Sequence, residues 1–253
     1  MPADRPAARI AEISPATLVL LNTGEIAARN LVEGLAIDFQ KLITAVAPRL
    51  PPAAVAAIDP ELGITKRMAI AAQCLIDHGD ARIITTLAAS PSDTVRGWAA
   101  YVIGLTPGLT LEQRLTRVRP LADDEHFGVR EWAWLAIRPH IGGDIDRAIS
   151  LLTPWTNDKS PAVRRFASEI TRPRGVWCTH ITQLKSTPAI ALPILEPLRS
   201  DPEKYVQDSV ANWLNDAGKS QPKWVKMLCR RWQKESKTPA TAQICKRAQR
   251  GLA

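Results

Sequence analysis

The sequence predicts an all-α solenoid, in which pairs of helices stack as repeats along the chain. A Val-Arg pattern followed by an aromatic residue and alanine recurs every 34 residues, starting at Val95, Val129 and Val163. Apolar residues recur with helical spacing, and no segment shows the sustained alternation of a strand. The twenty prolines lie mostly between the predicted helices, where they act as helix boundaries. Internal repetition at this period is typical of stacked helix pairs.

The repeated pattern lies on the second helix of each predicted pair. A fourth, degenerate copy starts at Val206, after a longer interval of 43 residues. Positions 0, 3, 4 and 7 of each copy fall on one side of a helix and are apolar or small, so we expect them to face the core. The four valines should therefore be buried in corresponding places, and Trp132 and Phe166 also lie on this stripe.

The elements follow in order from these patterns. Residues 1–18 are rich in Pro and Ala and are predicted to be partly irregular. Residues 25–47 carry a broad apolar stripe ended by prolines and are predicted to form one helix. We predict one repeat domain over residues 1–253. Further helices are predicted over 66–77, 80–89, 93–104, 110–121, 127–137, 144–154, 160–171, 178–186, 189–199, 203–217, 221–235 and 239–250.

The positive charge of the chain is concentrated in its C-terminal part. The net charge is +8, but residues 161–253 hold 17 Lys+Arg against 7 Asp+Glu, whereas residues 1–160 hold 16 against 18. A regional excess of this kind is typical of proteins that bind a polyanion, nucleic acid above all. The alternative is a surplus of charge that serves solubility.

The sequence indicates neither a metal site nor a membrane protein. Its four cysteines form no CxxC pair, and Cys178 and His180, two apart on a predicted helix, do not share a face. No glycine-rich phosphate loop or Ser-His-Asp order is present. We see no signal peptide and no run long enough to cross a membrane. We therefore expect no cofactor, and a cytoplasmic protein with free thiols.

Three carboxylates lie on one flank of successive repeat helices. Glu131, Glu169 and Asp216 occupy positions 2, 6 and 10 of their copies, which predicts a diagonal line across the concave face. The same face is rich in cations, and carboxylates repel phosphates. The acids therefore either serve a cationic substrate or activate water, or they pair with neighbouring arginines, as is common on helix surfaces.

A loop with two arginines and a tryptophan follows the helix that carries Glu169. Pro173 ends that helix and Gly175 permits a sharp turn. Arg172 and Arg174 could hold phosphates, and Trp177, outside the core stripe, suits stacking on a sugar or base. The alternative for Trp177 is packing against the next helix.

Several of these segments resemble one family. The runs RRFASE (164–169) and RPRGVW (172–177), with VREWA (129–133) and SVANWLND (209–216), resemble the AlkC/AlkD superfamily of DNA alkylation-repair glycosylases. The AlkC branch is the closer match, and residues 30–39 also resemble it. Some members of that branch carry a further immunoglobulin-like domain, for which this sequence has no strand-rich tail.

The resemblance implies a right-handed superhelix of HEAT-like repeats with a basic concave surface. It implies a monomeric, metal-free glycosylase that removes cationic N-alkylated bases from double-stranded DNA: 3-methyladenine, and for the AlkC branch also 1-methyladenine and 3-methylcytosine. The family's catalytic acids match Glu131, Glu169 and Asp216, and the aromatic residue beside the lesion matches Trp177. We also assign Trp132 to lesion contact. The predicted phosphate contacts are Arg130, Arg164, Arg165, Arg172, Arg174 and Lys219.

Two other functions fit the same sequence. A non-catalytic repeat protein that binds DNA structures would keep the basic groove without needing all three acids. A protein-binding HEAT scaffold would need neither the basic C-terminal part nor the arginine loop. Salt-dependent binding to duplex DNA distinguishes the second of these from a DNA-binding protein.

Overall fold

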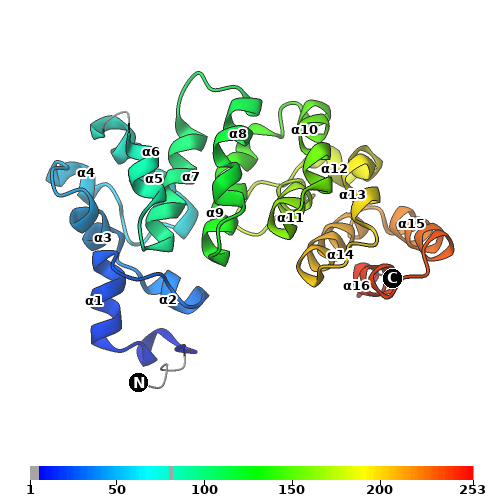
Figure 1. Cartoon of the computed structure of the whole chain (residues 1–253), viewed down its shortest axis with the longest axis horizontal. Helices are drawn as coiled ribbons and strands as arrows, with labels where there is room; N and C mark the ends of the chain where they lie inside the picture. Colours follow the sequence, from blue (N-terminus) through cyan, green and yellow to red (C-terminus); the bar gives the residue numbers. More distant parts are fainter. Residues whose placement is uncertain (1–5, 80–81, 253) are drawn as a thin grey trace. The chain divides into compact units, whose positions relative to one another are not determined.

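In the computed structural model, which describes residues 6–79 and 82–252, every regular element is a helix and no strand occurs (Figure 1). The predicted all-α class is therefore confirmed. The chain divides into two compact units. The first comprises residues 1–109 and 124–136, and the second comprises residues 110–123 and 137–253.

The first unit holds the helices up to α7 together with nearly all of α9. Here α5 and α6 both pack against α7, and α1 packs against α3. Its elements are η1 (Ile10–Glu12), α1 (Pro15–Thr23), α2 (Leu31–Ala36), α3 (Phe39–Val46), α4 (Pro52–Ala56), α5 (Ile64–His78), α6 (Ile83–Ala88), α7 (Asp93–Leu105) and α9 (Phe127–Ile137).

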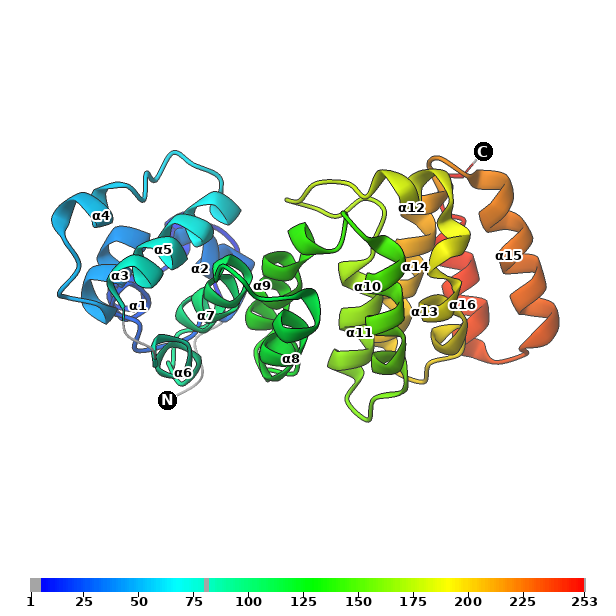
Figure 2. The ribbon, with the colours of Figure 1, turned by 90° about the horizontal axis from the view of Figure 1, so that it is seen from above.

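The second unit shows the repeat most clearly. Helices α11, α14 and α16 pack side by side in succession, and α13 and α15 flank them (Figures 1 and 2). Its elements are α8 (Leu111–Ala122), η2 (Arg138–His140), α10 (Ile145–Leu152), η3 (Thr153–Asn157), α11 (Pro161–Ile170), α12 (Thr182–Ser186), η4 (Pro188–Ala191), α13 (Leu192–Leu198), α14 (Lys204–Gly218), α15 (Pro222–Glu235) and α16 (Pro239–Ala248).

The N-terminal predictions need correction. Residues 25–47 form two short helices, α2 and α3, rather than one. Asn30 caps the first and Asp38 caps the second by accepting bonds from backbone amides, so each polar side chain starts a new helix. Residues 6–14 are largely irregular, as predicted, and the rest of that predicted segment, residues 1–5, lies outside the described part of the chain. Helix α1 begins at Pro15, because Ser14 caps it and Pro15 suits its first turn.

The repeat assignment is confirmed. Val95, Val129, Val163 and Val206 are each the third residue of their helices, and all four are buried. The long interval before Val206 contains the loop that carries Trp177. The extra length of this interval therefore includes the loop between α11 and α12.

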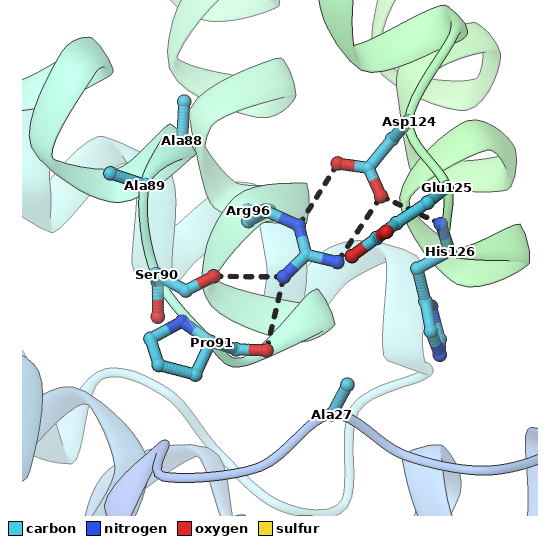
Figure 3. A pocket seen from close by; sticks show the side chains of 9 residues that line it. All are labelled: Ala27, Ala88, Ala89, Ser90, Pro91, Arg96, Asp124, Glu125 and His126. Carbon is cyan, nitrogen blue, oxygen red and sulfur yellow. Dashed lines mark hydrogen bonds and ion pairs between the residues drawn. The ribbon is translucent and has the colours of Figure 1, made fainter.

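The arginine that follows each valine has a structural role that the sequence analysis missed. Arg96 Nη1 donates to the carbonyl oxygens of Ser90 and Pro91 at 2.8 and 3.0 Å, which closes the loop in front of its own helix (Figure 3). Its Nε and Nη2 bind the Asp124 carboxylate, which stands in front of the next repeat helix. This arginine thus joins one repeat to the next.

Later copies repeat this geometry. Nη1 of Arg130 and of Arg164 reaches the carbonyls six and five residues back, and Gln207 Nε2 does the same in the fourth copy. Arg164 also binds Asp201 through Nε and Nη2, at 2.6 and 3.0 Å. These contacts account for the recurring arginine without DNA. Phosphate binding by Arg130 stays a prediction, and for Arg164 it is at odds with a guanidinium held in this way.

Candidate active site

A half-buried arginine joins two of the three predicted acids. Arg172 Nη1 donates to Glu169 Oε1 at 2.7 Å, and its Nε and Nη2 donate to Asp216 Oδ2 at 2.9 and 2.7 Å. Glu169 lies in the last turn of α11 and Asp216 in the last turn of α14. Because these two helices pack side by side, their shared flank brings the carboxylates to one guanidinium.

Three further side chains complete this network. Ser209 Oγ donates to Glu169 Oε2 at 2.6 Å, and Arg165 Nη2 lies 3.5 Å from the same oxygen. Lys219 Nζ binds Asp216 Oδ1 at 3.1 Å. The side chains of Glu169 and Asp216 are almost fully buried, whereas that of Lys219 is 54% exposed. Lys219 is therefore the partner that can leave most easily.

Local sequence sets both ends of α11, the helix that carries Glu169. Ser160 caps α11 and Pro161 occupies its first turn, so the register of Glu169 is set from the start of the helix. At the other end, Thr171 Oγ1 donates to the Ala167 carbonyl at 2.9 Å, and Pro173 follows two residues later. The helix therefore stops directly before Arg172.

The network keeps Glu169 ionised. Burial alone would raise the pKa of this carboxyl, but the charges of Arg165 and Arg172 and the Ser209 hydrogen bond outweigh it and lower the pKa below its ordinary value of 4.5. Burial likewise opposes the charge of Arg172, and the two carboxylates overcome it, so that its pKa is raised. At neutral pH the site thus holds a charged Glu169 carboxylate away from bulk water.

The loop between α11 and α12 presents an exposed aromatic ring. Trp177 is 47% exposed and has a φ of 61°, the one positive φ outside glycine among residues 6–79 and 82–252. Backbone in the left-handed region is unfavourable for a residue with a Cβ, and such strain clusters at functional sites. The exposure shows that Trp177 is not the packing residue considered as an alternative.

A close approach within the loop requires glycine at position 175. A Cβ there would lie 2.3 Å from Cys178 Sγ. The amide of Ile181 donates to the Pro173 carbonyl at 3.1 Å and closes the base of the loop. The position of the Trp177 ring therefore depends on a tight local turn.

Arg138 holds the two ends of this loop together, a role that the sequence did not predict. Its Nη1 donates to the Ile170 carbonyl and its Nη2 to the Arg172 carbonyl, both at 2.6 Å, and Nε and Nη2 reach the Thr179 carbonyl at 3.2 Å. The side chain is buried, and burial lowers its pKa. A lone arginine after a predicted helix carries no sequence signal of this role, because its partners are backbone carbonyls.

Arg174 connects the loop to the end of α14. Its Nη2 donates to Ser220 Oγ at 2.7 Å, and its Nε is buried without a hydrogen-bond partner. Arg174 and Lys219 thus lie at the rim of the Glu169–Asp216 network, on adjacent segments. Both positions suit the predicted phosphate contacts.

Glu131 and Trp132 lie in the first unit. Glu131 is half-buried on α9 and accepts a hydrogen bond from Trp134 Nε1 at 2.8 Å. Its convergence with Glu169 and Asp216 stays a prediction. Trp132 is only 7% exposed and packs edge-on against Tyr101, so we correct its assignment from lesion contact to core residue.

Among the described residues, no cluster of three or more His, Cys, Asp or Glu side chains is placed to hold a metal ion. In the same part of the chain, no helix has the length and apolar character needed to cross a membrane. All four cysteines are free thiols.

The fold and site together define a helical-repeat protein with a buried acid–arginine network beside an exposed aromatic loop. Residues 129–242 match the family described as DNA alkylation repair enzyme. The matched segment holds 114 of the 253 residues and includes all three predicted acids. A protein described as uncharacterized, YhaZ of Bacillus subtilis strain 168, is 42% identical over 128 residues, which cover 51% of this chain and 35% of YhaZ.

Three solved structures share the fold. The alkylpurine DNA glycosylase AlkC of Pseudomonas fluorescens, bound to DNA containing an abasic site analog, has a TM-score of 0.67 and 27% identity, covering 85% of this chain and 60% of AlkC. AlkD2 of Streptococcus mutans has a TM-score of 0.63 and 21% identity, covering 85% of this chain and 99% of AlkD2. The protein smu.31 of Streptococcus mutans UA159 has a TM-score of 0.61 and 23% identity, covering 75% of this chain and 93% of smu.31. This chain therefore spans less than two thirds of the length of both YhaZ and AlkC.

Proposed function

We propose that this protein is a DNA glycosylase that releases cationic N-alkylated bases from duplex DNA. The family match and the likeness to AlkC, an alkylpurine DNA glycosylase solved with DNA containing an abasic site analog, support this reaction class. The buried Glu169–Arg172–Asp216 network supports the chemistry. The proposed substrates are 3-methyladenine, 1-methyladenine and 3-methylcytosine.

The chemistry follows from the charge of the lesion. An alkylated base of this kind carries a positive charge, so that it leaves as a neutral molecule when its glycosidic bond breaks. Positive charge then develops on the sugar at C1′. A fixed carboxylate stabilises that charge and can orient or deprotonate the attacking water, whose oxygen bonds to C1′. Undamaged purines would leave as anions, so selectivity does not require a tight base pocket.

The lowered pKa of Glu169 suits it to this role, because the group stays ionised in a site with little water. A low-dielectric, preorganised carboxylate interacts more strongly with a developing cation than one in bulk water. In the free protein, Arg165, Arg172 and Lys219 balance the two acids. We propose that the exposed Lys219 moves from Asp216 to a DNA phosphate on binding, which leaves more negative charge at the site.

The remaining site residues have complementary roles in this proposal. Trp177 places an electron-rich ring against the sugar or the cationic base, where its exposure leaves it free to stack. Arg174, at the rim, contacts phosphate. Glu131 is the third acid, at a position of its repeat helix that shares the flank of Glu169 and Asp216.

The observation that carries the proposal is the pair of buried carboxylates held by one guanidinium beside an exposed, strained tryptophan. The test is release of free bases from methylated duplex DNA, with the bases identified by mass. We expect 3-methyladenine to be released by the wild type and to be lost when Glu169 or Asp216 becomes the corresponding amide. DNA binding without release of any methylated base would favour the non-catalytic alternative and refute the proposal.

A further inference from the structure

Helix α15 carries an exposed basic stripe, formed by Lys223, Met227, Arg230 and Lys234, that the proposed chemistry does not use. These four positions fall on one side of the helix. The opposite side buries Val225, Leu228, Cys229 and Trp232 against the rest of the unit. All four side chains of the stripe are exposed, Met227 by 62%. The stripe is therefore a solvent-facing surface rather than part of the core.

The stripe is cationic without local compensation. In the described part of the chain, Lys223, Arg230 and Lys234 have no acidic partner, whereas neighbouring Arg231 pairs with Glu196. From residue 217 to the end, the sequence holds ten Lys+Arg and one Asp+Glu. The positive charge that distinguishes the C-terminal part is thus greatest on α15 and α16.

Helix stability does not explain this placement. Lys223 lies in the first turn, where the helix dipole disfavours a cation. Arg230 and Lys234 are four residues apart, a spacing at which like charges destabilise a helix by a few tenths of a kcal/mol. The dipole favours Lys234 in the last turn, which offsets its repulsion from Arg230, so the cost to the helix falls on Lys223. The placement of Lys223 therefore points to a ligand for its charge.

The first turn of α15 directly follows the candidate active site in the sequence. Ser220, which binds Arg174, and Lys219, which binds Asp216, immediately precede the first turn of α15. Trp224 of α15 also lies against Trp213, at 6.4 Å between ring centroids, and Trp213 Nε1 donates to the Thr171 carbonyl at the start of the loop. The stripe therefore begins four residues after Lys219, at the end of α14 that carries Asp216.

We infer that this stripe binds the phosphate backbone of duplex DNA beyond the lesion, on one side of it. Lys223 and Lys234 are 11 residues apart, so the stripe extends about 16 Å along the helix. That length corresponds to about five base pairs of duplex at 3.4 Å each. The inference rests on the proposed DNA partner, and it predicts a minimum flank of duplex on one side of the damaged base.

Salt dependence of binding tests this. Neutralising the three cations in K223Q/R230Q/K234Q should lower the slope of log affinity against log salt by about 2.7, since each phosphate contact contributes about 0.9. Between 50 and 200 mM salt, the wild type should then lose about 40-fold more affinity than the variant. The effect should appear on a duplex of about 30 base pairs and vanish when one flank, and only that one, is cut to about two base pairs.

A matched control removes three charges elsewhere. Arg49, Lys66 and Arg117 are exposed and lie on other elements, so R49Q/K66Q/R117Q has the same net charge as the stripe variant. The inference is overturned if both variants lower the slope equally, or if the stripe variant binds every duplex as the wild type does. It is also overturned if the stripe variant keeps its DNA binding and instead loses binding to vesicles that contain phosphatidylserine.

Failure of this inference is separable from failure of the proposed function. The stripe variant is assessed by DNA binding alone, and base release is measured with the wild-type protein. A wild type that binds DNA through the stripe but releases no base would refute only the glycosylase proposal. A wild type that shows no salt-dependent binding to any duplex would refute both.

Discussion

Replacing Glu169 by glutamine separates catalysis from structural ion pairing. The amide keeps the shape of the side chain and removes its charge between Arg165 and Arg172. If the carboxylate stabilises the developing cation at C1′, its loss should cost about 2.7–4 kcal/mol, or about 10²–10³ in the rate of base release. DNA affinity should hold or rise, because a negative charge that repels phosphate is gone.

Instability cannot produce a rate loss of this size. Hydrogen bonds to charged groups contribute about 1.5–3 kcal/mol, which sets the expected loss in unfolding free energy. Native domains have an unfolding free energy of about 5–15 kcal/mol. A variant left with only about 2 kcal/mol would still be about 97% folded, so unfolding would reduce activity by a few per cent.

Asp201→Asn is the matched control. Asp201 is a buried carboxylate bound by two nitrogens of Arg164 at the other end of the α11–α14 junction, outside the site. The two amide variants should lose similar stability in urea denaturation, and only E169Q should lose single-turnover release of 3-methyladenine. Equal, small losses of rate in both variants would show that Glu169 serves only as an ion-pair partner, and the catalytic reasoning would be refuted.

Three further predictions concern the same region. Because the pKa of Glu169 is lowered in the folded state, this residue stabilises the fold at pH values above its ordinary pKa of 4.5 and loses that contribution as the pH falls through its folded-state pKa. In urea denaturation, the difference in unfolding free energy between the wild type and E169Q should therefore shrink as the pH is lowered. A difference that does not depend on pH would contradict this prediction. Gly175→Ala should destabilise the protein by about 1–3 kcal/mol through its clash with Cys178, and adding C178A should restore most of the loss in thermal melts. Trp177→Gly should relieve the strained φ, so stability holds or rises while base release falls; parallel losses of both would argue against a functional ring.

Sequence periodicity was sufficient for the fold class, the repeat and most helix boundaries. Val95, Val129, Val163 and Val206 mark equivalent helices, because helical periodicity and the apolar stripe are local properties of the chain. The same periodicity placed Glu169 and Asp216 on one flank, and adjacent packing of α11 and α14 then brought them together. The single helix predicted over 25–47 was wrong, because the capping side chains Asn30 and Asp38 override its continuous apolar stripe.

The partners of each charge emerged only from tertiary packing. Arg164 and Arg172 look alike in sequence, yet one joins two repeats through Asp201 and the other bridges Glu169 and Asp216. Their acidic partners lie up to 44 residues away, so the choice depends on how the next helix packs. Arg138 and the strain at Trp177 are equally absent from local pattern, because backbone carbonyls and dihedral angles acquire their geometry only when the loop closes on the folded helices.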